Sequence, residues 1–302
     1  MLSVIIPAYN EKLNIEHSYQ RISDILSSQN IDFEIIYIDD GSTDGTWTQI
    51  SSISGADSTI HGVRFSRNFG KEAAIFAGLE KAEGECVAVI DCDLQHPPEK
   101  LVDMFRLWEA GFEVIEGVKS DRGNESLIHG AFAKLFYKII NTASDIDMER
   151  ASDFKLLDRK AVNVLLNMKE KNAFFRALSS WVGFSTTSVE FEVEERISGE
   201  SKWSSWALMK YAVNNITSFS SAPMQIVTFL GVIMLIISVV LGMNSLIQKI
   251  NGTALGGFTT VIIIELFVGS IIMISLGVIG IYISKIYEEV KARPRFIITD
   301  EL

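Results

Sequence analysis

The chain of 302 residues has little cysteine and no excess of positive charge. It contains two cysteines, Cys86 and Cys92, so we expect reduced thiols in a cytosolic domain and no disulfide framework. Lysine and arginine number 27 against 38 aspartate and glutamate, and the formal net charge is -11. This balance argues against a protein that binds nucleic acid by neutralising its phosphates, so no nucleic-acid partner is expected.

Both common glycine-rich phosphate loops are also missing. The turn after the first predicted strand, Leu2–Ile6, reads PAYNE and contains no GxGxxG. Gly70-Lys71 is followed by Glu72, and the position five before Gly70 is Phe65, so this segment is no P-loop either. A nucleotide bound here must therefore be held by carboxylates, an aromatic ring and a metal ion.

The N-terminus lacks a basic segment followed by a long apolar one, so no signal peptide is expected. Apolar residues nevertheless make up 48% of the chain, and the mean hydropathy of +0.24 is high for a soluble protein. Two uniformly apolar runs, at about 226–247 and 259–283, are each long enough to cross a membrane. The pattern of residues 206–222 before them predicts an amphipathic helix at the membrane interface.

The distribution of basic residues predicts how these spans are oriented. Four cations follow the second run: Lys285, Lys291, Arg293 and Arg295. The short connection 248–258 contains only Lys249. By the positive-inside bias, both termini and the domain formed by residues 1–205 lie in the cytoplasm, and residues 223–302 form a membrane domain with a basic cytosolic tail.

The first hundred residues alternate between strand-like and helix-like patterns. Short apolar runs at 2–6, 33–38, 63–65 and 86–90 predict buried strands, and the apolar spacing at 13–27 and 70–82 predicts helices. Such alternation predicts an α/β fold with a mostly parallel sheet and helices on both faces.

The acidic motif Asp91-Cys92-Asp93 directly follows the buried run Cys86–Ile90. Carboxylates at the carboxyl end of a buried parallel strand lie where open α/β sheets bind their ligands. A pair of aspartates can hold a hard divalent cation, and that cation can hold a diphosphate. The alternative is a solvated turn in which both side chains cap backbone amides.

Six segments together resemble glycosyltransferase family 2, specifically the polyisoprenyl-phosphate glycosyltransferases, which include bactoprenol glucosyltransferases and dolichyl-phosphate mannose synthases. The matching segments are VIIPAYNE (4–11), IDDGSTDGT (38–46), FSRNFGKEAAIFAGL (65–79), DCDLQHPPE (91–99), SDFKLLDR (152–159) and RISGESKW (196–203). The QxxRW signature of processive polysaccharide synthases is absent, which favours transfer of a single sugar.

The resemblance implies a GT-A fold and assigns roles to particular residues. The nucleotide would be held by Pro7, Tyr9, Glu11, Asp40, Lys71 and Asp91. Mg²⁺ or Mn²⁺ would be held by Asp93, with Asp91 and Gln95 beside it. The catalytic residues would be Asp153, Arg196 and Lys202. The acceptor phosphate would be held by Arg196, Ser201, Lys202 and Lys119. Many relatives have arginine in place of Lys119.

Asp153 matches the position usually assigned as catalytic base, but the chemistry of the acceptor argues for another role. A phosphate monoester has a second pKa of about 6, so near neutral pH it is already largely dianionic and needs no base. Asp153 would then orient the acceptor or a cation. A purely structural alternative is a helix cap, or a salt bridge to Lys155 or Arg159.

The resemblance implies transfer of one hexose from UDP-glucose or UDP-N-acetylglucosamine to undecaprenyl phosphate, with inversion, in a bacterial cell membrane. The product would be a lipid-linked sugar for modifying cell-envelope glycans. The alternatives are transfer of mannose from GDP-mannose and a catalytically idle membrane assembly subunit. The resemblance also implies a homo-oligomer, a tetramer in related proteins.

Overall fold

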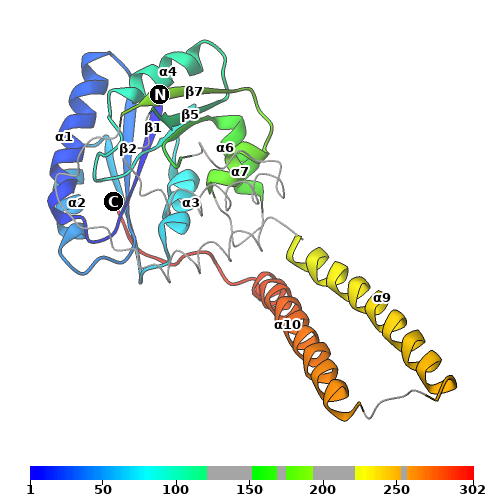
Figure 1. Cartoon of the computed structure of the whole chain (residues 1–302). Helices are drawn as coiled ribbons and strands as arrows, with labels where there is room; N and C mark the ends of the chain where they lie inside the picture. The colour runs from blue at the N-terminus through cyan, green and yellow to red at the C-terminus, as the bar shows by residue number, and fades with distance from the viewer. Residues whose placement is uncertain (121–151, 169–174, 193–221, 253–256) are drawn as a thin grey trace. The chain divides into compact units, whose positions relative to one another are not determined.

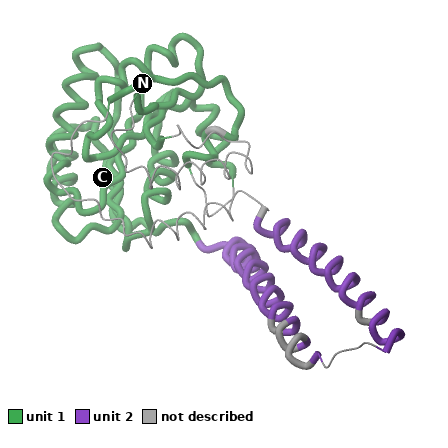
Figure 2. The backbone as a smooth tube through the Cα atoms, viewed as in Figure 1, with its two compact units in different colours: residues 1–205, 294–302 green, residues 206–293 purple. Residues whose placement is uncertain are grey.

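The computed structural model describes residues 1–120, 152–168, 175–192, 222–252 and 257–302. The chain divides into two compact units (Figure 2). The first contains residues 1–205 together with 294–302, and the second contains residues 206–293.

The first unit is built on an eight-stranded sheet with the strand order β7-β5-β6-β4-β1-β2-β3-β8 (Figure 1). The strands are β1 (Leu2–Ala8), β2 (Phe33–Asp39), β3 (Ile60–Phe65), β4 (Cys86–Val89), β5 (Val114–Lys119), β6 (Lys155–Asp158), β7 (Thr186–Phe191) and β8 (Ile298–Glu301). Four pairings are parallel and three are antiparallel, the latter all involving β6 or β8. The predicted α/β fold with a mostly parallel sheet is confirmed.

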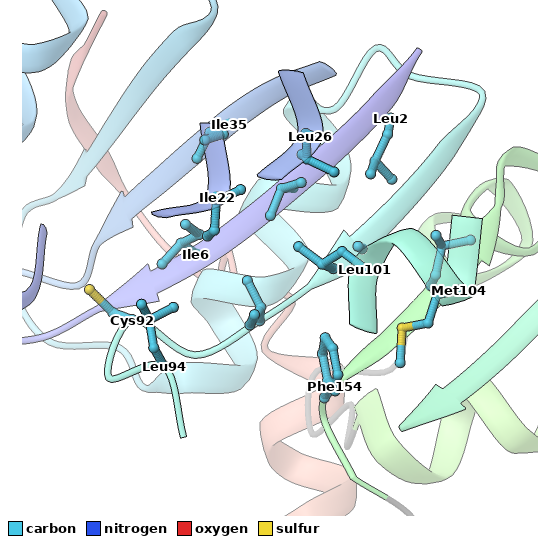
Figure 3. Packing of buried hydrophobic residues seen from close by; sticks show 14 of the residues in the cluster. Leu2, Ile6, Ile22, Leu26, Ile35, Cys92, Leu94, Leu101, Met104 and Phe154 are labelled. Carbon is cyan, nitrogen blue, oxygen red and sulfur yellow. The ribbon is translucent and has the colours of Figure 1, made fainter. Parts of the chain in front are cut away.

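The helices of this unit follow from apolar residues at helical spacing. They are α1 (Lys12–Ser28), α2 (Thr46–Ser54), α3 (Lys71–Lys81), α4 (Lys100–Glu109), α6 (Arg159–Asn167) and α7 (Phe175–Trp181). In α1 the buried face includes Ile15, Ile22 and Leu26, which belong to the hydrophobic core. Figure 3 shows Ile22 and Leu26 beside Ile6 and Ile35 of the sheet. Fully burying one such side chain stabilises the fold by about 1.5–3 kcal/mol.

The prediction that Pro7 ends the first strand is wrong, because β1 continues to Ala8. The backbone N–H of Ile90 donates to the carbonyl of Ile5, so odd-numbered residues of β1 direct their backbone groups toward β4. The ladder between β1 and β4 ends at Ile5 and Val89. Pro7 lies two residues beyond that end, where a missing N–H costs no ladder hydrogen bond.

Two strands were not predicted, β6 and β8. β6 lies antiparallel between β4 and β5, and β8 lies antiparallel against β3. The sequence pattern assigned residues 298–301 to the basic tail, whereas in the structure residues 294–302 belong to the first unit. A short, acidic strand such as β8 is a common way of ending a sheet, because it discourages pairing with other chains.

The second unit contains α9 (Ala222–Ile250) and α10 (Phe258–Val290). Within them, Pro223–Ile250 and Phe267–Val290 have mean hydropathies of 2.8 and 2.2, and their most apolar windows have no buried residues. Both stretches are long and apolar enough to cross a membrane, as predicted. The amphipathic helix predicted over 206–222 lies almost entirely outside the described residues.

Candidate active site

A pocket of about 290 Å³ opens beside the carboxyl ends of β1, β2 and β4. Its lining residues are Pro7, Ala8, Tyr9, Glu11, Asp40, Asn68, Gly70, Lys71, Ala74, Asp91, Cys92 and Asp93. All six residues that the family resemblance assigned to the nucleotide are among them, and so is Asp93. The structure therefore brings together residues from four separate stretches of sequence at the edge where α/β sheets bind ligands.

Asp40 fixes the loop between β3 and α3 that forms one side of this pocket. Its two carboxylate oxygens accept hydrogen bonds from the backbone N–H groups of Phe69, at 2.6 Å, and Gly70, at 2.9 Å. Burial raises the pKa of Asp40, and these two hydrogen bonds oppose the shift. The next residue, Gly41, has φ +69°, and a Cβ there would lie 2.4 Å from the carbonyl carbon of Arg67. Only glycine permits this close approach of the two loops.

The loop between β1 and α1 forms a second side of the pocket. It is held to the loop after β2 because the backbone N–H of Asn10 donates to Ser42 Oγ at 2.9 Å, and that of Glu11 to Thr46 Oγ1 at 3.0 Å. Tyr9 remains 43% exposed in this loop. Its ring is therefore available to stack on a planar ligand such as a nucleotide base.

Asp91 and Asp93 follow β4 and line the pocket. Asp93 Oδ1 accepts a hydrogen bond from the backbone N–H of Gln95 at 3.3 Å. The Gln95 side chain is not among the lining residues. Asp91 Oδ1 lies 2.6 Å from the ammonium nitrogen of Lys71, and its Oδ2 lies 4.0 Å from Nδ1 of the buried His96. Burial lowers the pKa of His96, so this ring is neutral near pH 7.

The register of β6 explains why Asp153 lies beside the pocket. Because β4 and β6 are antiparallel with Val89 opposite Lys155, the residues after β4 lie next to the residues before β6. Asp153 thereby comes within reach of Lys71, whose Nζ is 2.9 Å from Asp153 Oδ2. Arg176, in the first turn of α7, donates to both oxygens of Asp153, at 3.1 Å and 3.0 Å.

Lys71 thus bridges two carboxylates, Asp91 and Asp153. Desolvation lowers the pKa of Lys71, but the two negative charges outweigh it and raise the pKa above its ordinary value. Desolvation likewise raises the pKa of Asp153, yet Lys71 and Arg176 bring it well below the usual range. Both groups are ionised at neutral pH. The Lys71 side chain keeps 40% of its surface exposed, so solvent screens these ion pairs in part.

Glu72 belongs to the same cluster but faces α7. Its Oε2 accepts a hydrogen bond from the backbone N–H of Phe175 at 2.8 Å. Burial and the nearby Asp153 raise the pKa of Glu72 to about 7, against the opposing effects of the Phe175 hydrogen bond, Lys71 and Arg176. Neither Glu72 nor Arg176 was predicted as a site residue. No motif marks Arg176, and only its pairing with Asp153 reveals it.

The donor set fits a divalent cation that arrives with a diphosphate. Among the described residues, no group of three or more His, Cys, Asp or Glu side chains is arranged to hold a metal ion. Asp91 and Asp93 supply two carboxylates, and Mg²⁺ typically takes one or two carboxylates and completes its shell with phosphate oxygens and water. Mn²⁺ accepts the same oxygen ligands.

Lys155 and Arg159, the two residues weighed as salt-bridge partners of Asp153, both make close contacts elsewhere. Lys155 is buried and pairs with Glu116 at 2.5 Å, and Arg159 donates to the carbonyls of Ala82 and Gly84 at 2.8 Å. Lys119 is exposed at the end of β5 and does not line the pocket. The remaining predicted acceptor residues, Arg196, Ser201 and Lys202, lie outside the described residues.

The chain belongs to glycosyl transferase family 2, whose sequence profile matches residues 3–166. It is a glycosyltransferase with a GT-A fold. It is 38% identical over 301 residues to an uncharacterized glycosyltransferase of Synechocystis, covering 99% of this chain and 95% of that relative. It is 36% identical over 299 residues to a prophage bactoprenol glucosyl transferase homolog of Escherichia coli, covering 98% of each chain. The bactoprenol glucosyl transferase of Shigella phage SfII is also 36% identical, covering 98% of this chain and 97% of its own.

Two solved structures share the fold. The mannosyltransferase PcManGT from Pyrobaculum calidifontis, in complex with GDP-Man and Mn²⁺, superimposes with a TM-score of 0.51 at 18% identity, covering 72% of this chain and 63% of that one. Glucosyl-3-phosphoglycerate synthase from Mycobacterium tuberculosis, in complex with Mn²⁺, UDP-glucose and phosphoglyceric acid, gives 0.50 at 20% identity, covering 72% and 77%.

Proposed function

We propose that this glycosyltransferase moves a single hexose from a UDP-sugar to undecaprenyl phosphate at a bacterial cell membrane. The observation that carries the proposal is the combination, in one chain, of an acidic pocket at the sheet edge with two helices of membrane-spanning length. Relatives matched over nearly the whole chain are named bactoprenol glucosyl transferase, which favours glucose as the sugar and a polyprenyl phosphate as the acceptor.

The donor would occupy the pocket with its base against Tyr9 and its diphosphate toward Asp91 and Asp93. Asp40 keeps the loop at Phe69 and Gly70 in place. Glu11, which also lines the pocket, would add a second carboxylate at the nucleoside end. Mg²⁺ or Mn²⁺ bound at Asp93 with Asp91 would neutralise the negative charge that develops on the departing UDP. These residues orient the donor so that its anomeric carbon faces the acceptor.

Lys71 would supply a second positive charge next to the leaving group. Its ammonium group lies 2.6 Å from Asp91, at the diphosphate end of the pocket, and Asp153 holds it from the other side. A cation fixed where charge develops stabilises the transition state at little reorganisation cost. The Lys71 ammonium and the metal site therefore act on the same diphosphate.

Asp153 would position cations and not remove a proton. An efficient general base has a pKa near the operating pH, whereas Lys71 and Arg176 hold the pKa of Asp153 far below it. The acceptor phosphate is already dianionic near neutral pH and can attack the anomeric carbon without losing a proton. Attack from the face opposite UDP inverts the configuration at that carbon.

The acceptor phosphate would be bound by Arg196, Ser201 and Lys202, with Lys119 at the end of β5 as a further cation. We propose that α9 and α10 cross the membrane with both termini in the cytoplasm, where nucleotide sugars are made. The positive-inside bias of residues 285–295 supports this orientation. Assembly into a tetramer stays a prediction.

A donor screen tests the proposal. Purified full-length protein in vesicles containing undecaprenyl phosphate is offered UDP-glucose, UDP-N-acetylglucosamine and GDP-mannose in turn, with Mg²⁺ or Mn²⁺. We expect a labelled lipid with UDP-glucose or UDP-N-acetylglucosamine. A labelled lipid only with GDP-mannose would establish the alternative donor. No product with any donor would favour the idle assembly subunit.

A further inference from the structure

The residues that follow the last membrane-length helix return to the catalytic unit. Residues 294–302 belong to the first unit, although residues 206–293 form the second. The chain therefore connects the two units twice, once after Ser205 and once before Pro294. We call residues 294–302 the C-terminal strap.

The strap is held by specific side-chain contacts in addition to the ladder between β8 and β3. The guanidinium group of Arg295 donates to the carbonyl oxygen of Met168 at 2.7 Å and lies 4.3 Å from the ring centroid of Phe76. The ring of Phe296 stacks on that of Phe65 with centroids 5.0 Å apart and planes 9° apart. These contacts involve both a cation–π interaction and a stacked aromatic pair, each of which adds to simple burial.

The strap also contacts the helix that carries Lys71. Lys71 is the first residue of α3, Phe76 lies in the middle of α3, and Lys81, the last residue, pairs with Glu301 of the strap. Strap contacts thus run from the middle to the end of the helix whose beginning lines the donor pocket. Helix α3 is itself fixed to the sheet, because Gly78 packs directly against Ile5.

The link between α10 and the strap is short. Helix α10 ends at Val290, and residues 291–294 alone separate it from Arg295, a distance of at most roughly 18 Å even in a fully extended chain. Pro294 further restricts the backbone of this link. The end of α10 therefore cannot move far from the strap.

We propose that the C-terminal strap is a second tether that restricts how the donor pocket moves relative to the membrane helices. This inference rests on the proposed function, in which the acceptor phosphate lies at the membrane surface. A single connection would allow the catalytic unit to pivot, whereas two connections hold the anomeric carbon of the donor at the level of that phosphate. Holding two reactants in a reactive geometry raises the rate, because the entropy of bringing them together is lost before the reaction step.

Two other roles of the strap predict different results. If the strap only completes the sheet, its loss damages the catalytic unit as a whole. If Arg295 of the strap only attracts anionic lipid, any basic residue nearby serves equally well. Arg293, which is exposed two residues before Arg295, provides the matched control for the second possibility.

The first measurement is of position and does not depend on activity. A fluorophore is attached at Ser52→Cys, which is exposed on α2, while Cys86 and Cys92 are buried and do not compete. Energy transfer to labelled headgroups is recorded in vesicles for full-length protein. We expect Arg295→Ala combined with Phe296→Ala to broaden the distance distribution and Arg293→Ala to leave it unchanged. An unchanged distribution in the double variant overturns the proposal.

The second measurement compares two acceptors. With undecaprenyl phosphate in vesicles, we expect the double variant to lose at least about tenfold in transfer rate, because the reactants are no longer held in register. With a water-soluble short-chain prenyl phosphate, its rate and its UDP-glucose affinity should stay within about twofold of wild type. Equal losses with both acceptors, or an equal loss in Arg293→Ala, overturn the proposal. The single variant Arg295→Ala, which keeps β8 and Phe296, should give a smaller loss in the same direction.

If the wild-type protein transfers sugar to neither acceptor, the proposed function fails, and the distance measurement still decides whether the strap is a tether.

Discussion

At the scale of single residues, the centre of the site is an ammonium group placed between two carboxylates. Lys71 contacts Asp91, which belongs to the predicted metal motif, and Asp153, which belongs to the segment before β6. We expect Lys71→Met to reduce kcat/KM by about 10²–10³-fold, because the charge next to the leaving diphosphate is lost. Lys71→Arg should retain more activity, although its planar group cannot contact both carboxylates in the same way.

The control for Lys71 is Lys100→Met, which removes another lysine side chain, half-buried and paired with Asp103 on α4. It should leave kcat/KM unchanged. Equal activity of Lys71→Met and wild type contradicts a role for Lys71 at the diphosphate.

Asp93 is the residue expected to hold the metal ion. Asp93→Asn should reduce kcat by about 10²–10⁴-fold, because several kcal/mol of charge stabilisation in the transition state are lost. Asp91→Asn should impair activity less. Titration with Mn²⁺ in the presence of UDP, followed by electron paramagnetic resonance, should show weakened binding in Asp93→Asn and normal binding in Asp103→Asn. Normal Mn²⁺ binding by Asp93→Asn rules out this site.

The sequence predicted which residues gather at the pocket but not which of them pair. Pro7, Tyr9 and Asp40 belong to segments with recognisable motifs at strand ends, so their convergence follows from the topology. Arg176 lies in a helix without a motif, and its distance from Asp153 depends on how α7 packs. Long-range ion pairs of this kind are set by tertiary contacts, which a single sequence does not display.

At the scale of elements, helix α7 is attached to the pocket through Glu72 and Arg176. Glu72 has a pKa of about 7 in the folded protein, against about 4.3 for an ordinary glutamate in the unfolded chain. Between these two pH values Glu72 is protonated in the folded protein and ionised in the unfolded chain. Stability attributable to Glu72 therefore falls as the pH rises through this range. Asp153 has the opposite shift, and its contribution is lost only at more acidic pH.

Between pH 5 and pH 8, ionisation of Glu72 should lower the free energy of unfolding of the wild type by about 1–3 kcal/mol. We predict that Glu72→Gln, which cannot ionise, removes much of this decrease. The melting temperature of the detergent-solubilised full-length protein is measured at both values. The melting temperature of the wild type should be lower at pH 8 than at pH 5, and this difference should be smaller in Glu72→Gln. An equal difference in both proteins contradicts a raised pKa of Glu72.

Gly41 permits the contact between two loops of the pocket. Gly41→Ala should weaken UDP-glucose binding by at least about tenfold, because the added methyl group overlaps the backbone of Arg67 and displaces the loop that Asp40 holds. Gly45→Ala is the matched control: it also has a positive φ, +94°, but its nearest neighbour is the flexible side chain of Lys12 at 3.5 Å. It should cost stability without a comparable loss of nucleotide affinity.

The two strands that the sequence did not predict share a physical cause. β6 is four residues long and inserts antiparallel into an otherwise parallel region, so neither its length nor its pattern distinguishes it from a loop. β8 is acidic and exposed, and only its pairing with β3 makes it a strand. By contrast, the central strands are buried on both faces, and their apolar runs predicted them directly.

At the scale of the whole molecule, the orientation in the membrane decides which side supplies the donor. With both termini in the cytoplasm, a cysteine introduced at Asn251, between α9 and α10, should react with a membrane-impermeant thiol reagent in intact cells. Cysteines at Ser52 or Thr299 should react only after the cells are opened. The natural cysteines, Cys86 and Cys92, are buried and should not react with the reagent. The reverse pattern contradicts a cytoplasmic donor.

The most direct test of the proposed reaction is the stoichiometry of its products. Purified full-length protein in vesicles is given UDP-glucose and undecaprenyl phosphate with Mn²⁺, and both UDP and the extracted lipid are quantified, the lipid by mass spectrometry. Transfer of a single sugar predicts one UDP for each undecaprenyl phosphate that has gained the mass of one hexose, and neither product with Asp93→Asn. UDP without a glycosylated lipid, or lipids carrying several hexoses, would contradict it.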